Sequence, residues 1–443
     1  MLSRKVGLIG IKCLIDKWNV GSLPYGITDL SGGYSSMYNR FFKKWSESLK
    51  IGFILFLVVS CTISLCACGT EDSTDITFGL VYDENDNTWS SEDEKLKPLA
   101  NIMKRECGKS SDIKGSYILG TDDNIIFIGG INATDVNGNK VDAFTTYEIG
   151  SLTKMFTATA VLQLCEDGKI SLDDTLDKYF PEFKYGKDIT IDQLLHMRSG
   201  LRRDYVTEET FLSENGERNI EEWKRYYYDG FTDEELLDMV FDDELMFEPG
   251  TEFSYSNVGY NLLAMIIEKV TDRPYSDYLQ ENIFDICGMT HTSSMKTGDV
   301  TSVPEFVPSK DAPDEDPYEY VDTLYMQLIK PERGVGDIHS CAYDMLLFDR
   351  ALISGKLINE KSLTEMFDTD GSYGCGWMQY GELQHHPVDG IYFHGGETWV
   401  YKGYNMYCNT EKYGNVYLIQ LHPTTAGDEY SVECMQNIVM SLK

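Results

Sequence analysis

The sequence has little positive charge for its length. Its 443 residues include 38 lysines and arginines against 72 aspartates and glutamates, a formal charge of −34. Binding to nucleic acid is not expected, because affinity for phosphates comes largely from basic side chains. The acidic balance also argues against attachment to anionic lipid through the protein's own surface charge. With 42% hydrophobic residues, the chain still has enough apolar material for a buried core.

Closely spaced cysteine pairs are also missing. Of the 11 cysteines, seven lie beyond residue 68, and none of these seven belongs to a C-x-x-C pair. They are Cys107, Cys165, Cys287, Cys341, Cys375, Cys408 and Cys434. Because they are scattered, odd in number and mostly set among apolar residues, we interpret them as reduced core residues. The spacing indicates neither a zinc site nor a disulfide framework.

A long uncharged run, IGFILFLVVSCTISLCA, occupies residues 51–67 and follows a basic flank. This pattern is typical of a secretory signal. Its end, LCAC at residues 65–68, resembles the lipobox of bacterial lipoproteins, which implies that Cys68 carries a lipid anchor. The alternative is an uncleaved transmembrane helix, since 17 residues are near the lower limit for spanning a bilayer. Either interpretation places the following residues outside the cytoplasm, anchored to the cell membrane.

The chain is predicted to have three parts: a leader at 1–67, a polar tether at 68–92 and one large domain at 93–443. We hypothesise that Met37 is the true start. Strand-like runs occur near both ends of the domain, and helical patterns lie between them. This order predicts an α+β fold, in which an antiparallel sheet is formed from both chain ends with flanking helices, plus an inserted, mainly helical lobe.

The first chemical motif is a Ser-x-x-Lys string at Ser151 and Lys154. It opens a predicted helix, 151–166, that is apolar on nearly every side and is therefore buried. Residues i and i+3 share a helix face, and burial favours a neutral amine, so Lys154 could act as a base beside the Ser151 nucleophile. The helix N-terminus also supplies N–H groups where an oxyanion would form. The alternative is a lysine that reaches the surface beside an ordinary N-cap serine.

Two other Ser-x-x-Lys strings lack this context. They are Ser111/Lys114, in a polar stretch before a strand, and Ser293/Lys296, in a polar loop.

A second motif, Tyr255-x-Asn257, follows a Pro-Gly turn and precedes a helical pattern. A tyrosine beside a lysine can shuttle a proton, and an asparagine amide can hold a substrate carbonyl. Taken alone, the pair is equally typical of a turn tyrosine and a capping asparagine. A similar pair, Tyr407-x-Asn409, lies inside a predicted strand.

The third motif is His394-Gly395-Gly396 at the end of a predicted strand, followed by Glu397. Paired glycines allow a substrate backbone to approach a strand edge, and the N–H of Glu397 could be a second oxyanion donor. Alone, such a motif is more often a plain strand end. Lys296-Thr297-Gly298 is an alternative in a polar loop.

In this order, the three motifs resemble the serine β-lactamase and penicillin-binding protein superfamily, specifically its class C branch of β-lactamases, peptidases and esterases. The resemblance extends to the strings GKISLDDTLDKYFPEF and ITIDQLLHMRSGL. It implies that Ser151 is the acylated nucleophile, Lys154 its base and Tyr255 the proton relay.

The resemblance also implies a substrate-binding role for Asn257, His394, Gly395, Gly396 and Glu397. The N–H groups of Ser151 and Glu397 would then form the oxyanion hole. The reaction would use no metal and no cofactor.

Several departures bear on the substrate. A histidine replaces the usual lysine before the glycine pair, and an imidazole is largely neutral at pH 7. Glu397 stands where relatives usually have a neutral residue, and residues 204–248 hold 16 acids against three bases. These features disfavour a substrate with a free carboxylate, although Lys402 is a nearby cation whose position the sequence does not fix.

The sequence therefore predicts a serine hydrolase that acts on an ester or a D-amino-acid peptide. The substrate would be a small molecule or a peptide derived from the cell wall. The alternatives are a β-lactamase and a non-hydrolysing penicillin-binding or sensor protein.

Overall fold

The computed structural model describes most of the chain beyond residue 78. The described residues are 79–85, 87–111, 113–135, 138–206, 231–294, 333–369, 373–379, 390–398, 401–423 and 428–442. They belong to one compact unit, Ile76–Lys443. The predicted leader with Met37, and Cys68 at the start of the predicted tether, lie outside the described residues. None of the described helices is both long and apolar enough to cross a membrane.

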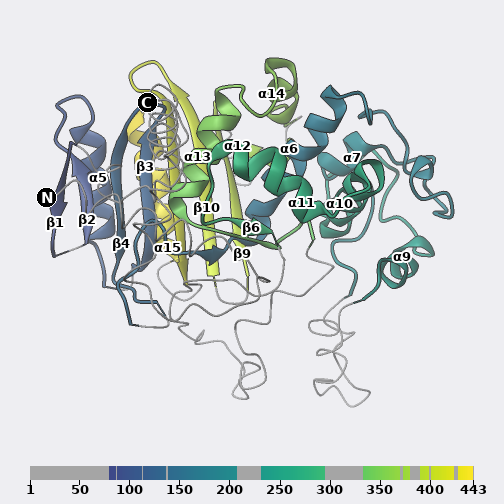
Figure 1. Ribbon diagram of the computed structural model, residues 1–443, viewed down its shortest axis with the longest axis horizontal. Helices are drawn as coiled ribbons and strands as arrows, with labels where there is room; N and C mark the ends of the chain where they lie inside the picture. Colours follow the sequence, from purple (N-terminus) through teal and green to yellow (C-terminus); the bar gives the residue numbers. More distant parts are fainter. Residues whose placement is uncertain are drawn as a thin grey trace, which may run out of the picture. The chain divides into compact units, whose positions relative to one another are not determined.

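An eight-stranded antiparallel sheet is built from both ends of this unit (Figure 1). Its strand order is β1-β2-β4-β3-β11-β10-β9-β8. The N-terminal strands are β1 (Leu80–Asp83), β2 (Thr88–Ser91), β3 (Gly115–Thr121) and β4 (Ile125–Ile131). The C-terminal strands are β8 (Met378–Gln379), β9 (Ile391–Glu397), β10 (Tyr401–Thr410) and β11 (Gly414–Pro423). Pairing of β3 with β11 joins the two sets, which confirms the predicted sheet from both chain ends.

Alternating side chains cover both faces of this sheet. Tyr117 and Leu119 of β3 join one apolar cluster, whereas Ile118 joins the other, as the period of two in a strand requires. The first cluster is closed by two helices, α5 (Lys97–Cys107) and α15 (Asp428–Leu442). The opposite face is covered by α13 (Ala342–Ile353), which packs against β3 and β11. The sheet is therefore the middle of three layers.

The predicted tether differs from the structure in its second half. Residues 80–83 and 88–91 are strands β1 and β2, and β2 pairs with β4 at the sheet edge. Thr88 and Ser90 are buried there although they are polar. Their polarity suggested a solvated linker. In the structure, pairing with β4 satisfies their backbone hydrogen-bonding groups, and the sequence pattern does not reveal this pairing. The sheet thus begins at Leu80 instead of beyond residue 93.

Between the two sets of strands lies the mainly helical lobe, as predicted. Its central helix, α6 (Thr153–Glu166), follows the 3₁₀ turn η1 (Gly150–Leu152). The other helical elements are η2 (Leu176–Lys178), α7 (Ile191–Leu195), α9 (Asp233–Phe241), α10 (Asn257–Thr271), α11 (Tyr275–Leu279), η5 (Gln280–Phe284), α12 (Asp285–Cys287) and α14 (Glu360–Met366). A small sheet contains β5 (Tyr147–Glu148), β7 (Ile338–Ser340) and β6 (Ser293–Ser294), in that order.

Helix α6 is buried on all sides because apolar layers surround it. Residues 153–162 are all buried, and α10, α11 and α14 pack against the helix. Figure 1 shows α7, α9, α10 and α11 gathered in the helical lobe, while the strands of the large sheet lie on the other side of α6. The buried helix thus lies where the two parts of the fold meet.

The seven cysteines beyond residue 68 are free, and five of them are buried.

Candidate active site

Ser151 lies in the tight turn that enters α6. The preceding Gly150 has φ = +52°, and a Cβ atom there would lie 2.8 Å from the backbone nitrogen of Glu397. Only glycine fits, because a side chain would both strain the left-handed backbone and collide with β9. Ser151 itself is partly exposed, so its hydroxyl is accessible. The turn therefore presents a serine directly beside the end of β9.

Lys154 lies one helical turn later, and its Nζ is 3.1 Å from Ser151 Oγ. The residue has 0% exposure, which excludes the alternative of a lysine that reaches the surface. Its Nζ also donates to the carbonyl oxygen of Val335 at 3.0 Å. The amine is thus fixed between a serine hydroxyl and a backbone acceptor, as a base for that serine must be.

The segment that carries Val335 is anchored to two helices. Thr157 Oγ1 of α6 donates to the carbonyl of Gly334 at 2.8 Å, and Asn261 of α10 donates to the carbonyl of Arg333 at 2.9 Å. Gly334 has φ = +77°, and a Cβ there would lie 2.6 Å from Ala264. Close packing with α10 therefore places the acceptor for Lys154.

Tyr255 approaches the same amine from the loop before α10. Lys154 Nζ lies 5.0 Å from the centre of the Tyr255 ring. The loop is held at both ends: the Ser254 N–H donates to the carbonyl of Met197 at 2.9 Å, and Ser256 caps α10 by accepting from the Gly259 N–H. Ser151, Lys154 and Tyr255, predicted from separate motifs, are thus brought together.

Asn257 is the first residue of α10, and a carboxylate fixes its side chain. Its Nδ2 donates to Asp204 Oδ1 at 2.6 Å. Its Oδ1 is buried and accepts no hydrogen bond among the described residues. Asp204 is also 3.3 Å from Arg203 Nε, and the Arg203 guanidinium lies 5.6 Å from the Tyr255 ring. Asn257 Oδ1 is therefore an acceptor without a hydrogen bond among the described residues, and it lies on a side chain beside the Arg203–Asp204 ion pair.

Strand β9 contacts the nucleophile turn through its glycines. A Cβ on Gly396 would lie only 1.9 Å from the carbonyl oxygen of Ile149, whereas one on Gly395 would meet Tyr404 at an ordinary 3.5 Å. A glycine is thus needed at position 396 so that the backbone of Ile149 can approach β9. The sequence had suggested that the glycine allows a substrate backbone to approach. This contact places the peptide N–H groups of Ser151 and Glu397 on neighbouring backbone segments, where two such donors can stabilise an oxyanion.

His394 lies beneath this strand end, with 1% exposure. Burial, together with the positive charge of Lys154, lowers the pKa of His394 to about 3, so the ring is neutral. Its Nδ1 is 2.7 Å from the carbonyl of Gly395, which can only accept, so Nδ1 carries the proton. Nε2 then accepts a hydrogen bond from Tyr373 Oη at 2.8 Å.

Both ring nitrogens of His394 are therefore bonded within the protein. The predicted substrate-binding role does not fit this arrangement, in which the ring orients β9 from below. The histidine was predicted from its motif, whereas no motif indicated Tyr373, which comes from the segment after α14. The Tyr373 ring contacts the Tyr255 ring edge-on, with the two ring centroids 6.0 Å apart.

Lys402 faces the site from β10. It pairs with Glu397 across the two strands, and its Nζ lies 3.3 Å from Glu397 Oε1. The Lys402 side chain is 17% exposed, whereas that of Glu397 is 67% exposed. The carboxylate therefore extends into solvent at the end of β9, and its charge is partly balanced by Lys402.

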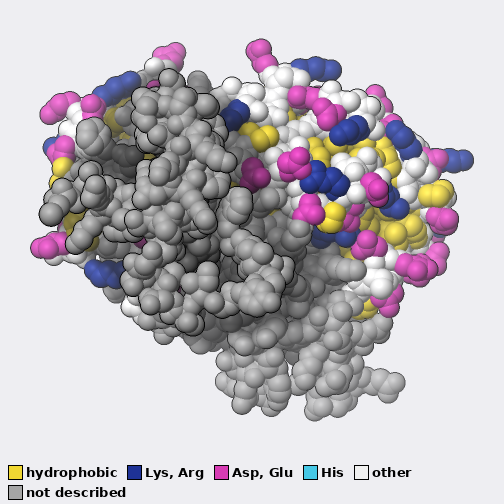
Figure 2. Space-filling model, viewed as in Figure 1, with side chains coloured by type: hydrophobic (Ala, Val, Ile, Leu, Met, Phe, Trp, Pro, Cys, Tyr) yellow, Lys and Arg dark blue, Asp and Glu magenta, His cyan; other side chains and the backbone are white. Residues whose placement is uncertain are grey.

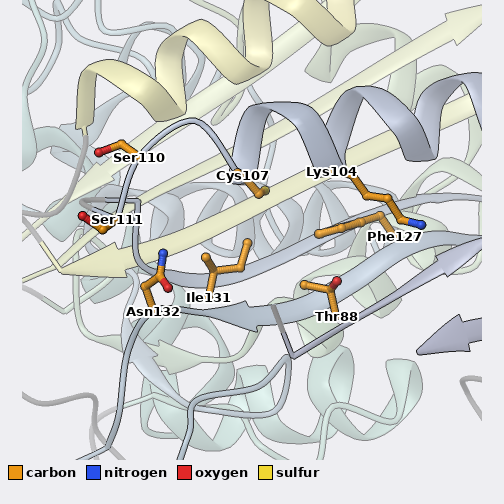
Figure 3. A pocket seen from close by; sticks show the side chains of 9 residues that line it. Thr88, Lys104, Cys107, Ser110, Ser111, Phe127, Ile131 and Asn132 are labelled. Atoms are coloured by element: carbon orange, nitrogen blue, oxygen red, sulfur yellow. The ribbon is translucent and has the colours of Figure 1, made fainter. Parts of the chain in front are cut away.

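The competing motifs lie in other surroundings. Ser111 is in a turn, where it lines a pocket of about 150 Å³ between α5 and strands β2 and β4. Figure 3 shows this pocket, with Lys104 and Cys107 on the helix and Ser110 and Ser111 on the following loop. Ser293 lies in strand β6 and Tyr407 in strand β10. Residues 296–298 are outside the described residues.

Known proteins share this fold and part of the sequence. Residues 104–432 match the Beta-lactamase family. The putative penicillin-binding protein PbpX of Bacillus subtilis (strain 168) is 31% identical over 247 residues, which cover 55% of this chain and 56% of that protein. The chain thus spans about half the length of this relative.

Two solved structures are similar over most of the chain. A penicillin binding protein from Bacillus halodurans has a TM-score of 0.60 at 20% identity, covering 77% of this chain and 98% of that one. A D-stereospecific amidohydrolase from Streptomyces sp. has a TM-score of 0.57 at 24% identity, covering 78% and 98%. The family match spans well over half of the chain and includes all three motifs of the site, so this protein belongs to the Beta-lactamase family.

Proposed function

We propose that this protein is a serine hydrolase that acts through an acyl ester on Ser151. The observation that carries the proposal is the fully buried Lys154 amine at 3.1 Å from the Ser151 hydroxyl. In its neutral form, the buried amine takes the hydroxyl proton as the oxygen attacks a carbonyl carbon. The N–H groups of Ser151 and Glu397 stabilise the oxyanion that develops.

Completion of the acylation step needs a proton for the leaving group. Tyr255, whose ring lies 5.0 Å from the Lys154 amine, transfers that proton as the acyl bond to the leaving group breaks. Water then attacks the acyl ester, and Ser151 regains its proton from the same pair. Asn257, whose side chain is held by its hydrogen bond to Asp204, orients the substrate beside Tyr255.

We further propose an ester or amide of a D-amino acid with a free ammonium group as the substrate class. Neutral His394 provides no charge for a carboxylate, and Glu397 extends a carboxylate into solvent beside the oxyanion donor. The D-stereospecific amidohydrolase of similar fold supports an amide of this kind. We place the reaction outside the cytoplasm, on a membrane-anchored protein, because of the signal-like run at 51–67 and Cys68.

A fluorophosphonate or fluorescent penicillin tests the nucleophile. We expect one label on Ser151, identified by peptide mass spectrometry, and complete loss of labelling in Ser151→Ala. Ser293→Ala is the matched control, because it removes the serine of another Ser-x-x-Lys string and should retain the label. An unlabelled but folded wild-type protein would contradict the proposal.

Turnover of a substrate panel separates the alternatives. We expect hydrolysis of D-alanyl amides or p-nitrophenyl esters and little hydrolysis of a chromogenic cephalosporin. Preferential turnover of the cephalosporin would instead indicate a β-lactamase. An acyl-enzyme that forms but never turns over with any compound would indicate a non-hydrolysing binder or sensor.

A further inference from the structure

Three potential metal ligands lie together beside the small sheet, on segments that do not carry Ser151, Tyr255 or His394. His291 precedes β6, Cys341 follows β7, and Asp344 lies in the first turn of α13. One nitrogen, one sulfur and one carboxylate oxygen from these residues lie within 4.8 Å of one another. The distance from His291 Nδ1 to Asp344 Oδ1 is 3.8 Å.

The carboxylate of Asp344 has one satisfied and one unsatisfied oxygen. Its Oδ2 accepts from the His291 N–H at 2.7 Å and from Thr292 Oγ1 at 2.8 Å. Its Oδ1 is buried and accepts no hydrogen bond among the described residues, although the side chain is only 1% exposed. A buried carboxylate oxygen without a donor is costly, so this atom indicates a missing partner. The bonds to Oδ2 orient the group as outer-shell bonds orient a metal ligand.

Cys341 directs its sulfur to the same point. It caps α13 by accepting the Asp344 N–H at 3.4 Å, and its exposure is 0%. Burial raises the pKa of this thiol well above its usual range. A bound cation reverses that preference, because a coordinating thiol loses its proton. The capping bond holds the sulfur in place before any ion arrives.

We propose that His291, Cys341 and Asp344 bind one divalent transition-metal ion of the zinc class. Zinc takes nitrogen, sulfur and oxygen ligands in a tetrahedron, with bonds of about 2.0–2.3 Å, so ligand atoms lie about 3.3–3.8 Å apart. The 3.8 Å between His291 Nδ1 and Asp344 Oδ1 already matches this range. The other separations are at most 4.8 Å, and His291 can move closer because 40% of its side chain is exposed. Water occupies the fourth position, and binding releases the Cys341 thiol proton to solvent.

Without metal, the same atoms form an ion pair. The adjacent Asp344 carboxylate raises the pKa of His291, which favours an imidazolium beside that carboxylate. That pair does not involve the Cys341 sulfur, which the capping bond from the Asp344 N–H holds beside it. The two arrangements make opposite predictions for cobalt, which substitutes for zinc and gives a strong near-ultraviolet absorption when it binds a thiolate.

Cobalt titration of the metal-stripped full chain tests the site. We expect about one equivalent to bind with a sulfur-to-cobalt absorption band and zinc to displace it. In Cys341→Ser the band should disappear, and affinity should fall at least about tenfold. The serine oxygen can still accept the Asp344 N–H, so the helix cap and the fold are retained; circular dichroism checks this.

Two further variants sharpen the test. His291→Gln changes a largely exposed residue and should also weaken binding. Glu365→Gln is the matched control, because Glu365 belongs to the other His/Asp/Glu group among the described residues, with Asp192 and His196; it should leave the band unchanged. A wild-type protein without stoichiometric binding, or a band that persists in Cys341→Ser, overturns the proposal.

Discussion

At the residue scale, the neutrality of His394 shapes the site. The ring is buried, and its two nitrogens contact Gly395 and Tyr373. A charged ring would lie near the Lys154 amine without solvent to screen either charge. The position that carries a lysine in related β-lactamases is thus occupied here by a neutral group that orients the strand.

This burial predicts a dependence of stability on pH. Because the pKa of His394 is lowered to about 3, the unfolded chain takes up the proton first as the pH falls below about 6.5. The free energy of unfolding therefore decreases towards acid, by about 1.4 kcal/mol per pH unit between about pH 6.5 and 4. Urea unfolding at constant ionic strength measures this slope.

His394→Gln should remove this contribution and reduce the acid slope, whatever its effect on absolute stability. Equal slopes in the wild type and the variant would show that the histidine is protonated in the folded protein.

Glu397 makes the second prediction at this scale. Its carboxylate is exposed and already 3.3 Å from Lys402, so its attraction for a substrate ammonium is modest, about 0.2–1 kcal/mol. Glu397→Gln should raise KM for a D-amino-acid amide or ester about two- to fivefold. The N-acetylated substrate, which lacks the ammonium, should be unaffected.

Glu411→Gln is the control, since it makes the same change in the exposed turn after β10. An equal effect on both substrates, or on both variants, would argue against an ammonium site at Glu397.

At the scale of elements, the contact between β9 and the η1 turn brings together the two N–H groups of the proposed oxyanion site. Two glycines allow it: Gly150 in the turn and Gly396 in the strand, each facing backbone atoms of the other segment. The pairing of β9 with β10 and the burial of α6 hold both segments from behind. Neither element makes the site alone.

Gly396→Ala should therefore separate the two segments. Its Cβ would require Ile149 to move, because 1.9 Å is far inside contact distance. Loss of one oxyanion donor typically lowers kcat about 10²–10³-fold, and we expect a decrease of about 10² with a smaller change in KM. Gly395→Ala is the matched control, since its Cβ finds an ordinary contact. Similar kcat values for the two variants would contradict this role for Gly396.

At the scale of the molecule, acidic charge exceeds basic charge by 34. On the coloured part of the face in Figure 2, aspartates and glutamates are interspersed with lysines and arginines. Local ion pairs therefore coexist with a long-range excess of negative charge. Such an excess destabilises the compact state through self-repulsion, and salt screens it within a Debye length of about 8–10 Å.

Thermal stability should consequently increase with ionic strength. We expect Tm to rise by a few degrees between low salt and physiological sodium chloride, measured by calorimetry above pH 6. Uncharged sucrose at matched osmolality separates screening from solvent exclusion. A Tm that falls with added salt would mean that local ion pairs outweigh the repulsion.

Much of the fold and site follows from local sequence. Strand-like runs predicted β3, β4, β9, β10 and β11 but not the short strands β1, β2 and β8. The uniformly apolar pattern of 151–166 predicted a buried helix. Ser151 and Lys154 are three residues apart on that helix, so their contact needs nothing beyond helix geometry. The tether was predicted too long because polar Thr88 and Ser90 are buried by pairing, which composition does not reveal.

Only tertiary structure decided the contacts between distant segments. Tyr373 meets His394, the Val335 carbonyl meets Lys154, and Gly396 meets Ile149 because separate elements pack together. Likewise, Cys341 lies 50 residues from His291, outside any recognisable metal-ligand spacing. The sequence determined which groups one helix or strand presents, since backbone geometry repeats over a few residues. Which groups meet across elements depended on how the whole core packs, and no local repeat encodes that.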